Sequence, residues 1–346
     1  MGHMEARAYW TVAPGQGEIR SEAIDPPGPG EALVRATRSA VSRGTELLVH
    51  RGGVPAAVAE QMRAPFQVGE LPGPVKYGYL SVGVVEAVGP GTEAPGVDDG
   101  WVGRRVFCLH PHQDRYVVPV TALTALPDDV PDHRAVLLGT VETAVNALWD
   151  GRPLYGDRVA VVGGGMVGAC ITALLAQLPL ERLELLDPDP ERRDVGGRLG
   201  ARAVAPEEAS GGCDVVFHAS ASPDGLQRAL EIVGDEAEVV ELSWYGDRPV
   251  TVDLGTDFHA RRLAVRASQV SRVSPHRSAR RDYAGRMQVA LRAAADPALD
   301  ALLAGPTPLD ELPTLMDRLA DGAPGLCHLV SYPKGPPCSP SPSATT

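Results

Sequence analysis

Apolar and polar residues alternate differently in successive parts of the chain. Up to about residue 126, short apolar runs alternate with Gly- and Pro-containing turns, which is typical of antiparallel or barrel-like β domains. From about residue 127 to residue 274, apolar strands alternate with helical stretches, which predicts a doubly wound parallel sheet. The predicted strands are 32–36, 82–88, 105–109 and 116–120 in the first part, and 159–162, 183–186, 215–218, 239–242 and 263–267 in the second.

The helical stretches follow the strands of the second part and continue beyond them. Their predicted ranges are 166–178, 190–199, 223–233, 283–295 and 309–319, with a last strand over 327–332. The uncharged run 159–180 is long enough to cross a bilayer, but its glycines and Pro179 favour a buried strand, a tight turn and a packed helix. The Pro/Ser-rich tail, 335–346, has no apolar period and is expected to be disordered.

Charge and cysteine content narrow the choice of partners and compartment. The formal net charge of −12 repels phosphate backbones and anionic lipid surfaces, so we expect neither nucleic acid nor a membrane as a partner. The five cysteines contain no Cys-x-x-Cys pair and are odd in number, which favours reduced thiols in a cytoplasmic protein.

The strongest chemical signal is a glycine motif, Gly163-x-Gly165-x-x-Gly168, that follows an apolar strand and opens an apolar helix. Gly163 permits a tight turn, Gly165 lets the backbone approach a pyrophosphate, and Gly168 allows the helix to pack closely on the strand. The free N–H groups of the helix start, at Met166 and Val167, point toward such a phosphate. This context predicts a dinucleotide-binding site.

Asp187 stands at the end of the next strand, where a carboxylate accepts hydrogen bonds from the adenosine ribose and disfavours a 2′-phosphate. The sequence therefore favours NAD over NADP. Arg192 and Arg193 follow closely and leave NADP as an alternative if their side chains turn toward the ribose.

Three further motifs resemble the medium-chain dehydrogenase/reductase family. Residues 78–89, Gly-Tyr-Leu-Ser-Val-Gly-Val-Val-Glu-Ala-Val-Gly, are similar to its Gly-His-Glu-x-x-Gly-x-Val-x-x-Val-Gly, and 43–46, Arg-Gly-Thr-Glu, to its Cys-Gly-Thr/Ser-Asp. Residues 143–148 resemble the helix that leads into its cofactor domain. The resemblance implies an α/β fold in which a GroES-like β-rich catalytic domain (1–126 and 275–334) accompanies a Rossmann doubly wound parallel sheet (127–274).

The resemblance also locates the three positions that hold the catalytic zinc ligands in the family. In this sequence the ligand residues are missing from these positions. Arg43, Tyr79 and Gly139 occupy the three places, and none is an ordinary zinc ligand. The family's structural zinc lobe would fall between Gly91 and Arg105, a segment without cysteine. We therefore expect a zinc-independent branch with no metal.

Without zinc, another group has to stabilise negative charge on the substrate oxygen. Tyr79 is the candidate proton donor, Thr45 matches the family's relay hydroxyl, and Arg43 is the candidate cation. The alternatives are a packing role for Tyr79, and for Arg43 a contact with the pyrophosphate or with Glu46. The other candidate pocket residues are Lys76, His110 and His112.

Topology and the family resemblance add four cofactor contacts. Ser220, Ser243 and Ser268 follow predicted strands at the edge where the nicotinamide lies in this fold, and Thr143 lies in the helix that leads into the cofactor domain. Separately, eight arginines and a single acid, Asp282, lie between residues 261 and 286. They form either an electropositive patch for an anionic substrate or a set of ion pairs or subunit contacts.

The sequence thus predicts a zinc-independent NAD(P)-dependent oxidoreductase acting on a ketone or secondary alcohol, a small-molecule substrate, in a homodimer. Two alternatives stay open at this point. One is a reductase of a conjugated C=C bond, and the other is a catalytically silent nucleotide-binding protein.

Overall fold

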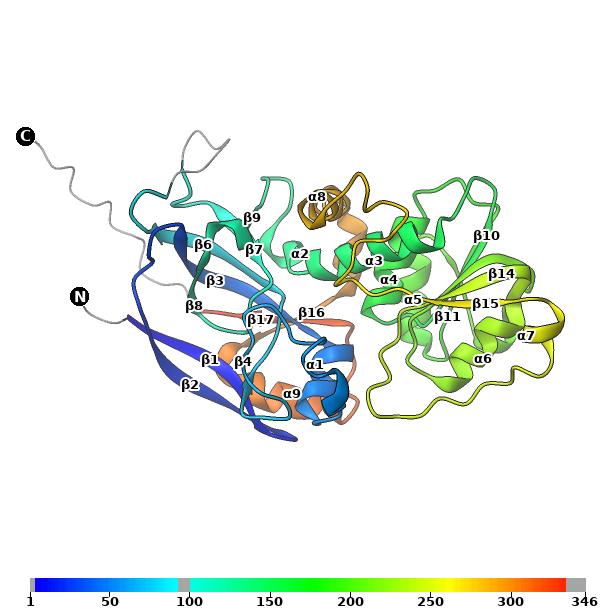
Figure 1. The fold of residues 1–346 in the computed structure, drawn as a ribbon, viewed down its shortest axis with the longest axis horizontal. Coiled ribbons are helices and arrows are strands. Elements are labelled where there is room, and N and C mark those ends of the chain that lie inside the picture. The colour runs from blue at the N-terminus through cyan, green and yellow to red at the C-terminus, as the bar shows by residue number, and fades with distance from the viewer. Residues whose placement is uncertain (1–3, 93–99, 334–346) are drawn as a thin grey trace, which may run out of the picture.

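A computed structural model describes residues 4–92 and 100–333, which form a β-rich half and a parallel-sheet half side by side (Figure 1). The predicted tail lies outside the described residues. The β-rich half contains β1 (Met4–Ala13), β2 (Gln16–Ile24), β3 (Glu31–Ser42), α1 (Arg43–His50), β4 (Val68–Gly69), β5 (Val75–Lys76), β6 (Ser81–Val88), β7 (Arg105–Cys108), β8 (Arg115–Pro119), β9 (Thr124–Ala125), β16 (Leu303–Pro308), α9 (Leu312–Ala320) and β17 (Cys327–Ser331).

The second half is built on six parallel strands with helices on both faces. Its elements are β10 (Arg158–Val162), α4 (Met166–Leu175), β11 (Arg182–Leu186), α5 (Pro190–Arg198), β12 (Arg202–Val204), β13 (Cys213–His218), α6 (Pro223–Ile232), β14 (Val233–Glu241), α7 (Asp257–Ala260), β15 (Ala264–Ala267) and α8 (Tyr283–Ala293). Helices α2 (Asp132–Ala135) and α3 (Leu138–Gly151) connect the halves.

The strand orders confirm the predicted fold class. The parallel sheet runs β12-β11-β10-β13-β14-β15, and the β-rich half holds the sheets β2-β1-β5-β4 and β16-β17-β3-β6-β7-β9, with β8 beside β3. Every predicted strand overlaps an observed one. The predicted helix 309–319 is wrong at its start, because Leu309–Glu311 form a 3₁₀ turn and α9 begins at Leu312, with a proline in its first turn. The hairpin β1–β2 and helix α1 were not predicted.

The uncharged run 159–180 divides as expected into β10, a glycine turn and α4. Within the described residues, no helix combines the length and the apolar character needed to cross a membrane.

Helix α3 joins the two halves through a shared apolar core. Val141 of α3 belongs to one buried cluster with Leu80 and Phe107 of the β-rich half and Phe217 of the parallel sheet. Gly139 makes this approach possible, because a Cβ there would lie 2.7 Å from Leu80 Cδ2. The predicted domain boundary at residue 275 separates α8 from the sheet half, yet α8 packs on α3 and shares this core.

A buried arginine holds the segment between β15 and α8. Arg286 of α8, 2 % exposed, donates to Glu142 Oε1 at 3.0 Å and to Asn146 Oδ1 at 2.7 Å. The same guanidinium donates to the backbone carbonyls of Val270, at 2.6 Å, and Arg272, at 3.2 Å. One side chain therefore ties α8 and α3 to the connecting segment.

Replacing Arg286 by Ala should lower the free energy of unfolding by about 3–5 kcal/mol, because Glu142 and two carbonyls lose a buried partner. Burial already raises the pKa of Glu142 more than Arg286 lowers it, so the loss of Arg286 should raise this pKa further. Urea denaturation measures the loss. The matched control is Arg198→Ala, which breaks an exposed i,i+4 pair with Asp194 and should cost less than about 1 kcal/mol. Equal losses in both variants would contradict this account.

Candidate active site

The glycine turn after β10 has the geometry that a dinucleotide requires. Gly163 has φ 104°, and a Cβ there would lie 2.7 Å from the Ser220 backbone, so only glycine fits. A Cβ on Gly165 would meet nothing within 4 Å, which leaves open space above the turn. No side chain caps the N-terminus of α4, so the N–H groups of its first turn, which includes Met166 and Val167, are available to a phosphate.

Asp187 supports this turn from the end of β11. Its carboxylate accepts the Gly164 N–H at 2.7 Å and the Asp189 N–H at 2.9 Å, and only 2 % of the residue is exposed. Arg192 Nη1 lies 3.5 Å from the same carboxylate, whereas Arg193 donates to the Asp187 carbonyl at 2.8 Å. A contact between Asp187 and ribose stays a prediction, and Arg192 is the half-exposed cation beside it.

The serines at the ends of β13 and β14 belong to a polar network that the sequence did not reveal. His218 Nδ1 lies 2.7 Å from Glu241 Oε2, and His218 Nε2 lies 2.6 Å from Ser220 Oγ. Ser243 Oγ accepts the Ala221 N–H at 3.0 Å. His218 and Glu241 are paired in register on adjacent strands, so polar residues at the ends of buried parallel strands were the available signal.

Two other predicted cofactor contacts have partners inside the protein. The Thr143 hydroxyl donates to the Gly139 carbonyl one turn earlier in α3, at 2.9 Å. The Ser268 hydroxyl, after β15, donates to Asp150 at 2.7 Å. Their roles at the cofactor stay predictions.

In the β-rich half, Tyr79 lies beside the start of α1. Its hydroxyl donates to Ser42 Oγ at 2.6 Å and is also hydrogen-bonded with Thr45. Burial and the Glu46 charge raise the pKa of Tyr79 to about 12, although the bonds with Ser42 and Thr45 lower it. The structure thus brings Tyr79 and Thr45 together, and the phenol is protonated at neutral pH.

Arg43, the first residue of α1, lies between the two halves. Its Nη1 donates to the Gly325 carbonyl at 2.6 Å. Burial lowers the pKa of Arg43, and the charges of Arg192 and Arg51 lower it further. The Arg192 contribution sets the Arg43 guanidinium near the glycine-turn side of the molecule.

Glu46 does not pair with Arg43 but joins a buried chain of polar groups. Its Oε1 accepts the Ser42 N–H at 2.7 Å, and its Oε2 lies 2.8 Å from His112 Nε2. His112 Nδ1 lies 2.7 Å from Ser39 Oγ, which lies 2.8 Å from the Tyr332 hydroxyl. Only 1 % of His112 is exposed, so the structure gives this predicted pocket residue a supporting position behind Ser42.

His110 and Lys76, the other predicted pocket residues, also have protein partners. His110 stacks on Tyr116 with ring centroids 3.8 Å apart, and burial lowers the pKa of His110 to about 3. Lys76 Nζ donates to Glu22 at 2.6 Å and to Gln113 at 2.8 Å. Both side chains are buried with partners inside the protein, and a contact of either one with substrate stays a prediction.

The donor set does not fit the zinc that the fold implies. Gly139 has no side chain, and the apolar side chains of Leu80 and Leu109 face it. Arg43 and Tyr79 occupy the other two positions at which the family has zinc ligands. Across residues 4–92 and 100–333, the structure contains no group of three His, Cys, Asp or Glu side chains that could hold a metal ion.

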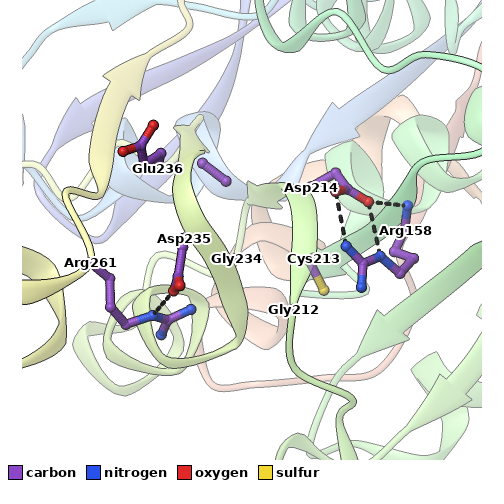
Figure 2. Close-up of a pocket in the computed structure, with 9 residues that line it drawn as sticks. Arg158, Gly212, Cys213, Asp214, Gly234, Asp235, Glu236 and Arg261 are labelled. Atoms are coloured by element: carbon purple, nitrogen blue, oxygen red, sulfur yellow. Dashed lines mark hydrogen bonds and ion pairs between the residues drawn. The ribbon is translucent and has the colours of Figure 1, made fainter.

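A surface pocket of about 450 Å³ lies at the amino ends of the parallel strands, at the other end of the sheet from the glycine turn (Figure 2). It is lined by the first residues of β10, β13 and β14 and by Arg261. Arg158 pairs there with Asp214 at 3.1 Å, and Arg261 with Asp235 at 2.8 Å. Because the glycine turn follows the carboxyl end of β10, this pocket is separate from the candidate site.

No family model matches the chain. It is 24% identical to (R,R)-butanediol dehydrogenase of Bacillus subtilis over 297 residues, 76% of this chain and 83% of the relative. The structure is similar to L-idonate 5-dehydrogenase of Escherichia coli, with a TM-score of 0.77, 15% identity and coverage of 96% and 99%. It is also similar to an Escherichia coli alcohol dehydrogenase complexed with NADH, with a TM-score of 0.73, 18% identity and coverage of 96% and 100%.

The strand orders are those of a two-domain fold like that of these solved dehydrogenases, and the glycine turn is open. Together with the three motifs and the curated relative, this fold makes the chain similar to the medium-chain dehydrogenase/reductase family.

Proposed function

We propose that this protein is a zinc-independent NAD(P)-dependent oxidoreductase that interconverts a ketone and a secondary alcohol. The observation that carries the proposal is the Tyr79 hydroxyl, which stands at a lost zinc-ligand position and bonds to Ser42 at 2.6 Å. In the same molecule, the glycine turn after β10 offers N–H groups to a dinucleotide.

When bound, the nicotinamide would supply or accept the hydride. With substrate bound, the single Tyr79 O–H turns from Ser42 to the substrate oxygen, donates a hydrogen bond to it and gives it a proton during reduction, since burial keeps the phenol neutral. Ser42 and Thr45 orient that hydroxyl. Arg43, on the side that faces Arg192, stabilises negative charge on the cofactor phosphates or on the substrate oxygen.

Substrate trials separate this function from two alternatives, a reductase of a conjugated C=C bond and a silent nucleotide-binding protein. The protein is assayed with a ketone and with the matching enone, using NADH and NADPH separately. Reduction of the ketone carbonyl supports the proposal. Reduction of only the enone double bond would instead assign a C=C reductase, in which Tyr79 protonates an enolate. Nucleotide binding without turnover of either compound would favour a silent binding protein.

We further propose a small-molecule substrate, a homodimer and a cytoplasmic location. The four cysteines of the described residues are buried and unpaired, which suits a reducing compartment. β15 is the end strand of the parallel sheet with all four side chains exposed, so its free edge suits pairing with a second copy.

We expect purified protein to carry no stoichiometric zinc, because Arg43, Tyr79 and Gly139 replace the ligands. Elemental analysis of the protein, together with turnover in the presence of EDTA, measures this. About one zinc per chain, with turnover lost in EDTA, would contradict the proposal.

NADH should bind more tightly than NADPH if Asp187 contacts the ribose hydroxyls, and Asp187→Ser should narrow the difference. Fluorescence titration gives both dissociation constants. Arg192→Gln is the matched control, because it removes the neighbouring cation and should weaken only NADPH. Tighter NADPH binding by the unmodified protein would show that Arg192 determines the preference.

Tyr79→Phe should lower turnover about 10²- to 10⁴-fold, the usual contribution of a general acid, while cofactor affinity is unchanged. Because the pKa of Tyr79 is about 12, the phenol should stay protonated and the activity it supplies should persist up to about pH 11. The control is Tyr77→Phe, whose ring lies edge-on to Tyr79 at 6.1 Å and which should change turnover little. Equal effects of the two substitutions would remove Tyr79 from the mechanism.

A further inference from the structure

The eight arginines between residues 261 and 286 fall into two groups in the structure. Four have carboxylate partners: Arg261 with Asp235 and Asp257, Arg262 with Glu236, Arg266 with Glu238, and Arg286 with Glu142. The other four, Arg272, Arg277, Arg280 and Arg281, are exposed and have no acidic partner in the part of the chain that the structure describes. Ion pairs therefore account for half of the set, and the alternative of an electropositive patch stays a prediction for the other half.

The unpaired arginines lie on one ordered segment, 269–281, which we call the arginine segment. Arg277 and Ser278 N–H groups bond to the Ser274 carbonyl, and Arg280 and Arg281 N–H groups bond to the Arg277 carbonyl. These successive turns follow helical spacing, which brings residues three and four apart close together. Three like charges are thus held near one another, which is unfavourable until an anion joins them.

The segment has little freedom to separate these charges. Arg286 holds the carbonyls of Val270 and Arg272, the Tyr283 hydroxyl donates to the Ser271 carbonyl at 2.7 Å, and Asn146 Oδ1 accepts the Ser274 N–H at 3.0 Å. The nearby acid, Asp282, accepts the Gly285 N–H at 2.7 Å as the cap of α8.

Two polar atoms of the arginine segment also lack partners. Ser274 Oγ and His276 Nε2 are buried without a hydrogen bond, and Ser274 is 1 % exposed. Buried polar atoms are nearly always paired in folded proteins. These two side-chain atoms therefore lack partners among the described residues, just as the four exposed arginines lack carboxylates there.

The arginine segment begins at the edge of the sheet that carries the glycine turn. It leaves the carboxyl end of β15 toward the β-rich half and returns to α8 (Figure 1). Ser268 N–H, just before it, bonds to the Glu241 carbonyl. Gln269 Nε2 lies 4.0 Å from Met62 Sδ, so the start of the segment contacts the opposite half.

We propose that the arginine segment binds an anionic group of the substrate, a carboxylate or phosphate remote from the reacting carbonyl. Guanidinium groups bind such oxyanions through paired N–H donors, and a local positive site on a chain of net charge −12 attracts them selectively. The substrate is therefore an acidic ketone or hydroxy compound. This inference rests on the proposed function, because it names the substrate class of that site.

The test compares the double variant Arg280→Gln/Arg281→Gln with Arg198→Gln/Arg262→Gln, which removes equal charge from exposed ion pairs. Steady-state kinetics use a neutral ketone and a keto acid of similar size. The KM for the keto acid should rise about tenfold or more in the first variant, with kcat and the neutral-ketone KM nearly unchanged. The control variant should match the unmodified protein.

A second arm needs no turnover and so separates this inference from the proposed function. Calorimetric titration of the cofactor-free protein with citrate should show binding that the first variant weakens about tenfold and the control does not. Equal citrate binding by both variants would overturn the inference, even if ketone reduction is found. A change in oligomeric state by light scattering, with unchanged KM values, would overturn it in favour of contact with an acidic face of a second copy.

Discussion

The close packing of α3 against both halves is the contact on which the rest of the structure depends. A glycine near each end allows it: a Cβ on Gly139 would lie 2.7 Å from Leu80, and one on Gly151 would lie 2.8 Å from Phe217. Leu80 directly follows Tyr79, and Phe217 directly precedes His218. The helix therefore fixes the spacing between the candidate proton donor and the strand ends that surround the glycine turn.

Chains of buried polar side chains fix the positions of individual hydroxyl groups, in addition to the spacing that α3 fixes. Glu46 holds the Ser42 N–H while His112 holds Glu46, and Glu241 holds His218 beside Ser220. Each chain lies behind a hydroxyl at the candidate site, so a residue that never touches a substrate still limits where that hydroxyl points. The arginine segment repeats this arrangement, with Arg286 as the buried support.

The sequence predicted the parts of the fold that depend on local pattern. The buried strands β10, β11 and β13 and the glycine turn follow from apolar runs and from backbone needs at Gly163. The hairpin β1–β2 was missed because β2 has no buried residue and because the buried residues of β1 include Thr11 and the small Ala6 and Ala8, which give a weak apolar signal. The partners of His112, Lys76 and Ser268 could not be predicted either, since each bond joins residues distant along the chain.

The chemistry at Tyr79 follows from which charges surround it. Burial and the neighbouring Glu46 charge both favour the neutral phenol, so the site keeps a proton ready and resists forming a phenolate. In the proposed mechanism, proton transfer from Tyr79 to a newly formed alkoxide is downhill, because an alkoxide is a stronger base than a phenolate. The resulting phenolate would then lie beside Glu46, a like charge, which favours its reprotonation.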